Sequence, residues 1–173
     1  MVGAGWVSSG NQLRYSRAAV LPRTYDDEIC SVARALEVVG ERWTLLLIRD
    51  AFGGLRRFGE FEASLGLSRK VLAERLDHLV DESVFERRPY SQRPERFEYR
   101  LTEKGLGLWK VLAHLMMWGD EHYGSEAGRP HLLVHRGCGG EADARLQCTH
   151  CGACLERGDI ALVPGPARQP SVR

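Results

Sequence analysis

The pattern of apolar and polar positions predicts a series of helices between residues 26 and 124. The first begins at Asp26 and ends at Gly40, because glycine favours the C-terminal end of a helix. A second covers about residues 41–51. In both, the apolar residues recur three or four positions apart and so share one face of the helix. They are Ile29, Val32, Ala33, Leu36 and Val39 in the first, and Trp43, Leu46, Leu47 and Ile48 in the second.

A short helix, a turn and a longer helix follow. Residues 55–57 are expected to form a brief strand, residues 58–65 the short helix, and Gly66-Leu67 a tight turn. Ser68 is a good N-cap for the longer helix, which keeps Leu72, Leu76 and Leu79 on one stripe. A helix, a glycine-containing turn and a second helix are the outline of a helix-turn-helix.

A β-hairpin and one long helix complete this part of the chain. Residues 84–90 and 97–101 alternate as strands, with residues 91–96 as the loop of a wing. Thr102 caps a helix that continues toward Tyr123 and carries apolar residues on two sides. One side can pack on its own domain and the other on a second copy, so we expect a homodimer. The expected fold class is mainly α with a small antiparallel β-hairpin, that is, α+β.

Composition restricts the classes of function. The 173 residues carry a net charge of only +1, so a highly charged partner must be met by a local cluster of charge. No apolar run is long enough to span a membrane, and the N-terminus lacks the pattern of a secretion signal. We therefore expect a cytoplasmic protein with reduced thiols. Gly53-Gly54 lacks a phosphate-binding context and no nucleophile is paired with a base, so we expect no enzyme.

The order of the elements points to double-stranded DNA. A helix-turn-helix followed by a hairpin offers one helix to the major groove and the hairpin to the flanking backbone. Cations are present at both places, and the residues that we expect to contact DNA are Ser68, Arg69, Lys70, Arg75, Arg93 and Arg96. The competing interpretation is a solvated helix face, because Glu74 and Asp77 make this helix only partly basic.

Several separated blocks also resemble one family. The run from Cys30 to Tyr90, followed by RPERFEYRLTEKG and MWGDEHY, closely resembles the HxlR family of MarR-like winged-helix transcription regulators over residues 26–124. The resemblance implies a homodimer built from the N-terminal and long C-terminal helices. It also implies that the helix from Ser68 is the recognition helix and that the hairpin around Arg93 is the wing. The matching blocks are Gly40 to Trp43, Arg57-Phe58, Lys70-Val71-Leu72 with Arg75-Leu76, and Glu98-Tyr99 with Leu101-Thr102.

The same resemblance draws attention to Cys30. Many members of that family have a cysteine at this position that senses electrophiles or oxidants, which makes Cys30 a candidate for redox sensing. The family usually has proline next, whereas this chain has Ser31. A thiol near a helix N-terminus can have a lowered pKa, but the acidic residues 26–28 oppose that effect. The alternative is a small hydrophobic side chain buried in the dimer interface.

Four of the five cysteines lie close together near the C-terminus. His135 and Cys138 form one half-motif, Cys148 and Cys151 another, and a glycine follows each half-motif. This spacing predicts a zinc-ribbon-like module at residues 131–163 that holds a structural Zn²⁺ through His135, Cys138, Cys148 and Cys151. We expect residues 1–25 to be a mobile arm, residues 26–124 the winged helix-turn-helix domain, and residues 164–173 a disordered tail.

Cys154 leaves alternatives open at this site. It can replace His135 in an all-thiolate zinc site, or remain a free thiol. Cys148, Cys151 and Cys154 also resemble part of an iron–sulfur ligand run, with Cys138 as the fourth ligand. A further alternative is that the thiols bind no metal, or that Cys148 and Cys151 form a redox pair.

The leading functional hypothesis is a homodimeric repressor that binds a pseudo-palindromic operator. Its signal acts at one of three places: at Cys30 as a redox change, at the zinc tail, or between the dimer helices, where a small-molecule or electrophile effector binds. The competing hypothesis is an adaptor, in which the zinc module docks a protein and the winged helix serves as a scaffold. Salt-dependent binding to DNA separates the two, because phosphate contacts release counterions.

Overall fold

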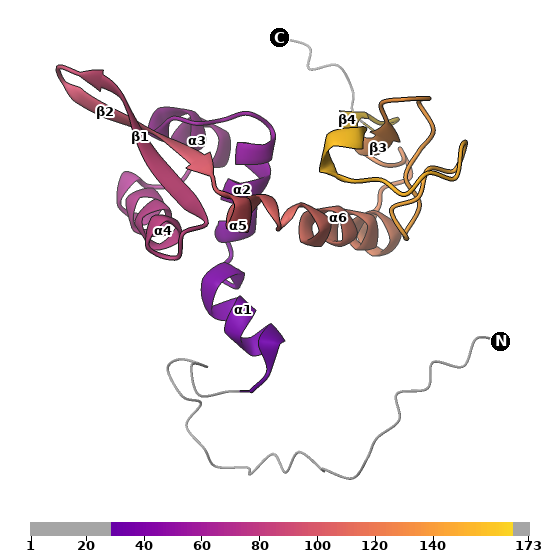
Figure 1. Cartoon of the computed structure of the whole chain (residues 1–173), viewed down its shortest axis with the longest axis horizontal. Helices are drawn as coiled ribbons and strands as arrows, with labels where there is room; N and C mark the ends of the chain where they lie inside the picture. Colours follow the sequence, from indigo (N-terminus) through magenta and orange to yellow (C-terminus); the bar gives the residue numbers. More distant parts are fainter. Residues whose placement is uncertain (1–28, 168–173) are drawn as a thin grey trace.

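The computed structural model describes residues 29–167. Helix α1 covers Ser31–Val39, with Cys30 as its N-cap residue. The predicted arm, residues 1–25, and the acidic residues 26–28 lie outside the described residues. Helix α1 has no buried residue and projects from the rest of the molecule (Figure 1). An amphipathic helix in this position leaves its apolar face uncovered within the single chain.

Three helices form the helix-turn-helix region: α2 (Thr44–Phe52), α3 (Phe58–Leu65) and α4 (Arg69–Asp81). Helix α3 has the predicted bounds, and Gly66 ends it with a φ of 63°. Helix α4 begins directly after Ser68, whose hydroxyl accepts a hydrogen bond from the Val71 N–H at 3.4 Å. Helix α2 begins later than predicted, because the Glu41 carboxylate accepts the Trp43 N–H at 2.9 Å and holds a turn there.

The hairpin consists of β1 (Phe85–Gln92) and β2 (Glu95–Leu101), paired antiparallel. Its strands are longer than predicted, because Arg96 pairs with Ser91 and only Arg93-Pro94 remains as the turn. The expected brief strand before α3 is reduced to a single bridge between Arg57 and Glu98. The structure therefore gives the wing a narrow tip.

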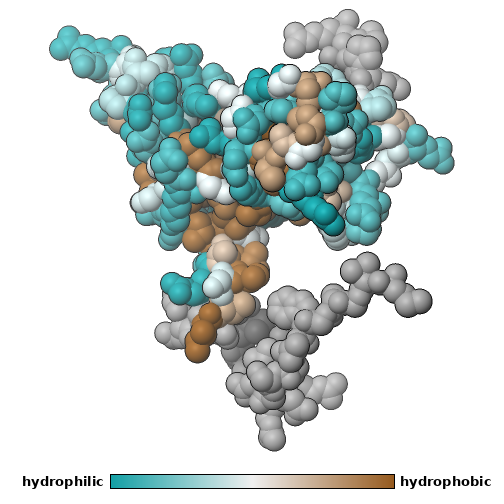
Figure 2. Space-filling view, turned by 45° about the vertical axis from the view of Figure 1, so that its right-hand side comes forward, coloured by the Kyte–Doolittle hydropathy of each residue, from teal (hydrophilic) through white to brown (hydrophobic). Residues whose placement is uncertain are grey.

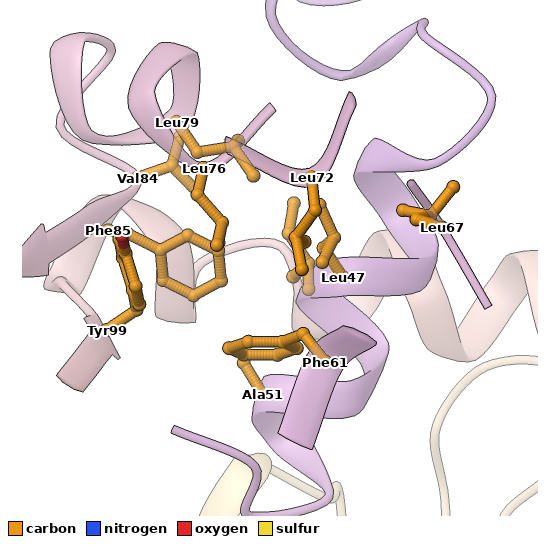
Figure 3. Close-up of a cluster of buried hydrophobic side chains, with 11 residues drawn as sticks. Leu47, Ala51, Phe61, Leu67, Leu72, Leu76, Leu79, Val84, Phe85 and Tyr99 are labelled. Atoms are coloured by element: carbon orange, nitrogen blue, oxygen red, sulfur yellow. The ribbon is translucent and has the colours of Figure 1, made fainter. Parts of the chain in front are cut away.

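The core of this domain lies between the three helices and the hairpin (Figure 3). Phe61 and Phe85 meet there with their ring centroids 6.3 Å apart. The spacing of apolar residues, three or four positions apart, explains the packing, since it places them on one face of each helix and that face points inward. Fully or almost fully buried side chains are Leu47, Ile48, Ala51, Phe61, Leu72, Leu76, Leu79, Val84 and Phe85.

The predicted long helix is divided into α5 (Glu103–Leu106) and α6 (Trp109–Tyr123). Gly105 of α5 lies against the hairpin, because a Cβ at that position would be 2.3 Å from the Val84 carbonyl oxygen. The chain therefore passes close to the hairpin before α6 begins. Gly107 then ends α5. Helix α6 leads from the winged helix to the C-terminal module (Figure 1).

The C-terminal module contains β3 (His131–His135), the 3₁₀ helix η1 (Arg157–Asp159) and β4 (Ile160–Pro164), with β3 and β4 antiparallel. Pro164, where the sequence placed the start of the terminal tail, pairs with His131, and residues 168–173 lie outside the described part. The module lies at the end of the molecule opposite the wing (Figure 1). Among residues 29–167, no helix is both long enough and apolar enough to cross a membrane.

Candidate nucleic-acid interface and metal centre

Helix α4 presents a polar face to solvent. Leu72, Leu76 and Leu79 are buried on its inner side, whereas Lys70 and Asp77 are exposed on the other side. Neither α6 nor the C-terminal module covers this helix, because both lie toward the other end of the molecule (Figure 1). A helix that is held on one side by leucines and is open on the other has the geometry needed to enter a groove.

Two cations stand in the first turn of α4, and each has an acidic neighbour. Arg69 is 76% exposed and lies 3.0 Å from the Glu62 carboxylate. Lys70 is 86% exposed and its Nζ lies 4.0 Å from Glu74. Exposed pairs of this kind contribute about 0–1 kcal/mol. A phosphate can therefore replace either carboxylate at little cost.

Arg75 lies on another side of α4. Its Nε atom is 3.8 Å from the Glu41 carboxylate, at the turn between α1 and α2, and its side chain is 29% exposed. The structure therefore does not bring Arg75 together with Arg69 and Lys70. The reason is the period of about 3.6 residues per turn. Arg75 follows Arg69 by six positions and Lys70 by five, so its side chain is rotated about the helix axis by roughly a third of a turn from each.

The tip of the wing carries two cations without acidic partners. Among residues 29–167, the structure gives Arg93 and Arg96 no ion pair, and both are exposed. The arginines farther down the hairpin are paired, Arg87 with Asp77 and Arg88 with Glu86. Free positive charge on the wing is thus concentrated at the end that reaches farthest from the core (Figure 1).

One further cation near the wing was not among the sequence-based candidates. The guanidinium of Arg57, at the N-cap of α3, lies over the ring of Tyr90 at 4.6 Å from its centroid. This stacking holds an exposed arginine beside the hairpin. The signal for it in the sequence is the Arg57-Phe58 block, one of the blocks that resemble the family.

Apolar side chains are exposed on α1 and on one side of α6. Val32 and Leu36 of α1 are 67% and 51% exposed, and Leu115 and Trp118 of α6 are 46% and 50% exposed. The space-filling view shows apolar residues along the projecting segment that contains α1 (Figure 2). Cys30 is exposed at the start of this helix. The thiol therefore lies beside an uncovered apolar face.

The C-terminal module brings four metal-ligand side chains together. One ligand atom from each of His135, Cys138, Cys148 and Cys151 lies within 4.8 Å of the other three. The Cys138 sulfur is 3.3 Å from His135 Nδ1 and 3.4 Å from the Cys148 sulfur. Sulfur atoms at the corners of a zinc tetrahedron are about 3.8 Å apart, given Zn–S bonds of about 2.3 Å. The four atoms thus have the spacing of a tetrahedral site.

Glycines make the two ligand turns. Gly139 and Gly152 follow Cys138 and Cys151 and have φ values of +75° and +73°, in the region that glycine favours. The carbonyl oxygen of His135 accepts the N–H of Gly139 at 2.7 Å. Gly140 is needed for a different reason, because a Cβ there would lie 2.6 Å from the Cys148 sulfur. The backbone therefore passes directly against the ligand cluster.

The surroundings of Cys148 favour its thiolate form. Its side chain is 2% exposed, and the backbone N–H of Cys151 donates to its sulfur, which lowers the pKa of the Cys148 thiol to about 6. Cys154 is not a member of the four-residue group, and its sulfur accepts a hydrogen bond from Gln147 Nε2 at 3.7 Å. The geometry thus favours His135 over Cys154 as the fourth ligand.

The comparison with protein families decides the identity of the chain. Residues 38–127 match the family described as HxlR-like helix-turn-helix. The chain belongs to this HxlR-like family. The match covers half of the chain and contains α2 to α6, that is, the helix-turn-helix, the wing and the following helices. The resemblance of the sequence blocks is therefore confirmed.

Individual relatives have the same description. An uncharacterized HTH-type transcriptional regulator of Mycobacterium tuberculosis (strain ATCC 25618 / H37Rv) is 52% identical over 136 residues, which cover 79% of this chain and 86% of the relative. The HTH-type transcriptional regulator YodB of Bacillus subtilis (strain 168) is 35% identical over 88 residues, or 50% of this chain and 79% of the relative. The first match is longer than the family region, so the similarity extends beyond residues 38–127.

Solved structures agree with this assignment. The crystal structure of PA1607, described as a transcription factor, superposes with a TM-score of 0.64 at 39% identity and covers 78% of this chain and 94% of that chain. The redox regulator HypR in its reduced form gives a TM-score of 0.52 at 28% identity, over 54% of this chain and 94% of that chain. The HxlR-like protein is therefore a transcription regulator of the helix-turn-helix type and not an enzyme.

Proposed function

We propose that the HxlR-like protein is a homodimeric repressor that binds a pseudo-palindromic operator through α4 and the wing. The observation that carries this proposal is the exposed first turn of α4, where the side chains of Arg69 and Lys70 are 76% and 86% exposed. The helix N-terminus adds its own attraction for phosphate. Ser68, as the N-cap residue, stands at the same end.

The wing completes the contact with DNA. Arg93 and Arg96 supply unpaired positive charge at its tip, where they can approach the backbone or the minor groove beside α4. Each phosphate that these side chains neutralise releases counterions, which makes binding depend on salt concentration. Arg75 has a structural part in this proposal, since it contacts Glu41 beneath the recognition helix.

A second copy of the chain accounts for the exposed apolar faces. Val32 and Leu36 on α1, with Leu115 and Trp118 on α6, form an apolar surface that one chain leaves open. Pairing these helices around a two-fold axis would present two copies of α4. Such a dimer reads two half-sites about 34 Å apart, which explains the symmetry of the proposed operator.

The C-terminal module holds a structural Zn²⁺ in this proposal. One imidazole and three thiolates are a common ligand set for structural zinc, and four protein ligands leave no open position for a reacting water. The small core of the module contains few fully buried apolar side chains, Leu155 and Ile160 among them. Metal binding therefore supplies much of the free energy that folds this module.

The regulatory signal acts near the dimer interface. Cys30 is an exposed thiol at the start of α1, so oxidation or alkylation there would alter the apolar face that joins the two copies. A small-molecule effector between the dimer helices would act on the same equilibrium. Regulation of transcription places the protein in the cytoplasm, where Cys30 is reduced in the absence of stress.

The decisive experiment measures binding to the DNA upstream of the protein's own gene at several salt concentrations. Arg69→Ala and Lys70→Ala should each weaken binding without changing dimerisation, and elemental analysis should find about one zinc per chain. If neither substitution alters the affinity, the recognition helix is elsewhere. If the protein shows no salt-dependent binding to DNA, the adaptor hypothesis replaces the repressor.

A further inference from the structure

A second group of arginines lines a crevice between the winged helix and the C-terminal module. The crevice holds about 320 Å³ of free space. Its walls come from the end of α2, the base of the wing, α5 and η1, which are distant in sequence. Its charged lining consists of four arginines and one glutamate: Arg56, Arg88, Arg100, Arg157 and Glu86.

Three of these arginines are held in place by the protein. The Arg56 guanidinium donates to the carbonyl oxygens of Ala51 and Leu55. Arg88 is paired with Glu86 through two nitrogens, at 2.8 and 2.6 Å. Such contacts fix the position of each cation, so the crevice does not need to reorganise when an anion enters.

The positive charges of the four arginines are only partly neutralised. Arg100 is one of the two that are paired. Its partner is Glu98, at 2.8 and 2.7 Å, and Glu98 is not part of the lining. In the pairing of the two strands, Arg100 lies opposite Glu86 and Arg88 lies opposite Glu98. Arg88 and Arg100 are thus each paired with a carboxylate, whereas Arg56 and Arg157 have no ion-pair partner among residues 29–167, and an entering anion would compensate these two charges.

Arg157 closes the crevice from the side of the module. Within residues 29–167 it has no hydrogen-bond or ion-pair partner. Its position is nevertheless defined, because the neighbouring Glu156 accepts a hydrogen bond from Lys110 of α6 at 2.9 Å and donates its own N–H to Asp159. An unpaired arginine on an anchored segment, which lines the same crevice as three held arginines, is an arrangement suited to an anion.

We propose that this crevice binds the phosphate group of a small phosphorylated molecule. Guanidinium groups bind phosphate through two parallel hydrogen bonds, which a single lysine cannot do. Phe52, Leu101 and Leu106 provide an apolar wall for the organic part of the ligand. The volume lies at the lower end of the range for small-molecule sites, about 300–1,000 Å³, which limits the ligand to a small one.

The crevice is separate from the proposed DNA-binding surface. Its lining includes neither α4 nor the wing tip, and Arg157 belongs to the module at the other end of the molecule. DNA that lies on α4 and on Arg93 would therefore leave the crevice free. This ligand site goes beyond the proposed repressor function, and its test requires no operator.

The test titrates the full-length, zinc-loaded protein with sodium pyrophosphate in a calorimeter, at an ionic strength held constant with sodium chloride. We expect saturable binding with one site per chain. Arg157→Gln should weaken it by about tenfold or more, because a charge-assisted contact is lost. Glu86→Gln should strengthen it, because the substitution removes the negative charge and releases Arg88. Arg145→Gln, on the exposed surface of the same module, should leave the affinity unchanged.

Two results would overturn the proposal. One is the absence of saturable binding, or equal affinities of the unaltered protein and Arg157→Gln, once circular dichroism and zinc content show that the variant is folded. The other comes from a short duplex of random sequence. If Arg157→Gln weakens binding to the duplex while pyrophosphate does not bind, the arginines serve the DNA backbone and not a small ligand.

Discussion

The guanidinium of Arg69, on α4, lies 3.0 Å from the carboxylate of Glu62, on α3. This pair joins the two helices of the helix-turn-helix. In the complex that we propose, Arg69 must exchange Glu62 for a phosphate. Breaking the Arg69–Glu62 pair costs free energy, so the pair weakens DNA binding by that amount.

Replacing Glu62 should accordingly strengthen DNA binding. In Glu62→Gln the arginine loses its ion pair and keeps its contact with the Phe58 ring, 5.1 Å from the ring centroid, and we expect a gain of up to about 1 kcal/mol, or roughly fivefold in affinity. Fluorescence anisotropy with labelled upstream DNA measures the change. Glu126→Gln, an exposed carboxylate near the module, is the matched control and should have no effect. A loss of affinity in Glu62→Gln would show that Arg69 needs the pair for its orientation.

Removing the wing-tip cations should reduce both the affinity and its salt dependence. Arg93→Ala and Arg96→Ala each delete one phosphate contact, so the slope of log K against log salt should become shallower by about 0.9 per residue. Titrations at four or more salt concentrations give this slope. Arg145→Ala in the module serves as the control. If the slope is the same in all three variants, the wing does not touch the DNA.

A methyl group at Gly140 should weaken the metal centre. A Cβ at this position would lie 2.6 Å from both the Cys148 sulfur and the Cβ of His150, so the ligand turn must move. We expect Gly140→Ala to cost about 1–3 kcal/mol in zinc binding. Competition with a chromophoric chelator measures it.

The module offers matched controls for this substitution. A Cβ at Gly158 meets nothing within 4 Å, so Gly158→Ala should keep full affinity for zinc. Cys154→Ser should also keep it, because Cys154 is not a member of the ligand group. Loss of zinc in Cys154→Ser, with retention in a His135→Ala variant, would assign the fourth ligand to Cys154.

A charge on the open side of α6 should prevent dimerisation. Leu115 is 46% exposed in the single chain, and burial of a glutamate against a second copy carries a desolvation penalty of several kcal/mol. Leu115→Glu should therefore shift the protein to a monomer in analytical ultracentrifugation and weaken binding to a two-half-site operator. Glu121→Gln on the same helix should sediment like the unaltered protein. A stable Leu115→Glu dimer would exclude this side of α6 from the interface.

Local capping chemistry explains why parts of the fold were predictable. Ser68 defines the start of α4 because its hydroxyl accepts an N–H within the same short segment, which the sequence displays directly. Gly66 likewise ends α3 where the left-handed backbone requires glycine. The spacing of His135, Cys138, Cys148 and Cys151 was equally local, since each half-motif lies on one turn.

Contacts between distant segments could not be predicted in the same way. The close approach of Gly105 in α5 to Val84 joins positions that are 21 residues apart in the sequence. The position of Arg75 on the recognition helix predicts a contact with DNA, whereas its ion pair with Glu41, 34 positions earlier, could not be predicted from the helix alone. The arginine crevice is a similar case, because Arg56 and Arg157 are 101 positions apart in the sequence and line one crevice only through the tertiary fold.

Trp109 and Leu108 are adjacent residues that pack into two different cores. Leu108 lies against the core of the winged helix, whereas Trp109 lies against Leu155 and Ile160 in the module. The indole ring is thus a built-in optical probe of the module, placed one peptide bond from the DNA-binding half. Any event that loosens the C-terminal module would change the surroundings of this ring and, through the same backbone, release a constraint on the other half.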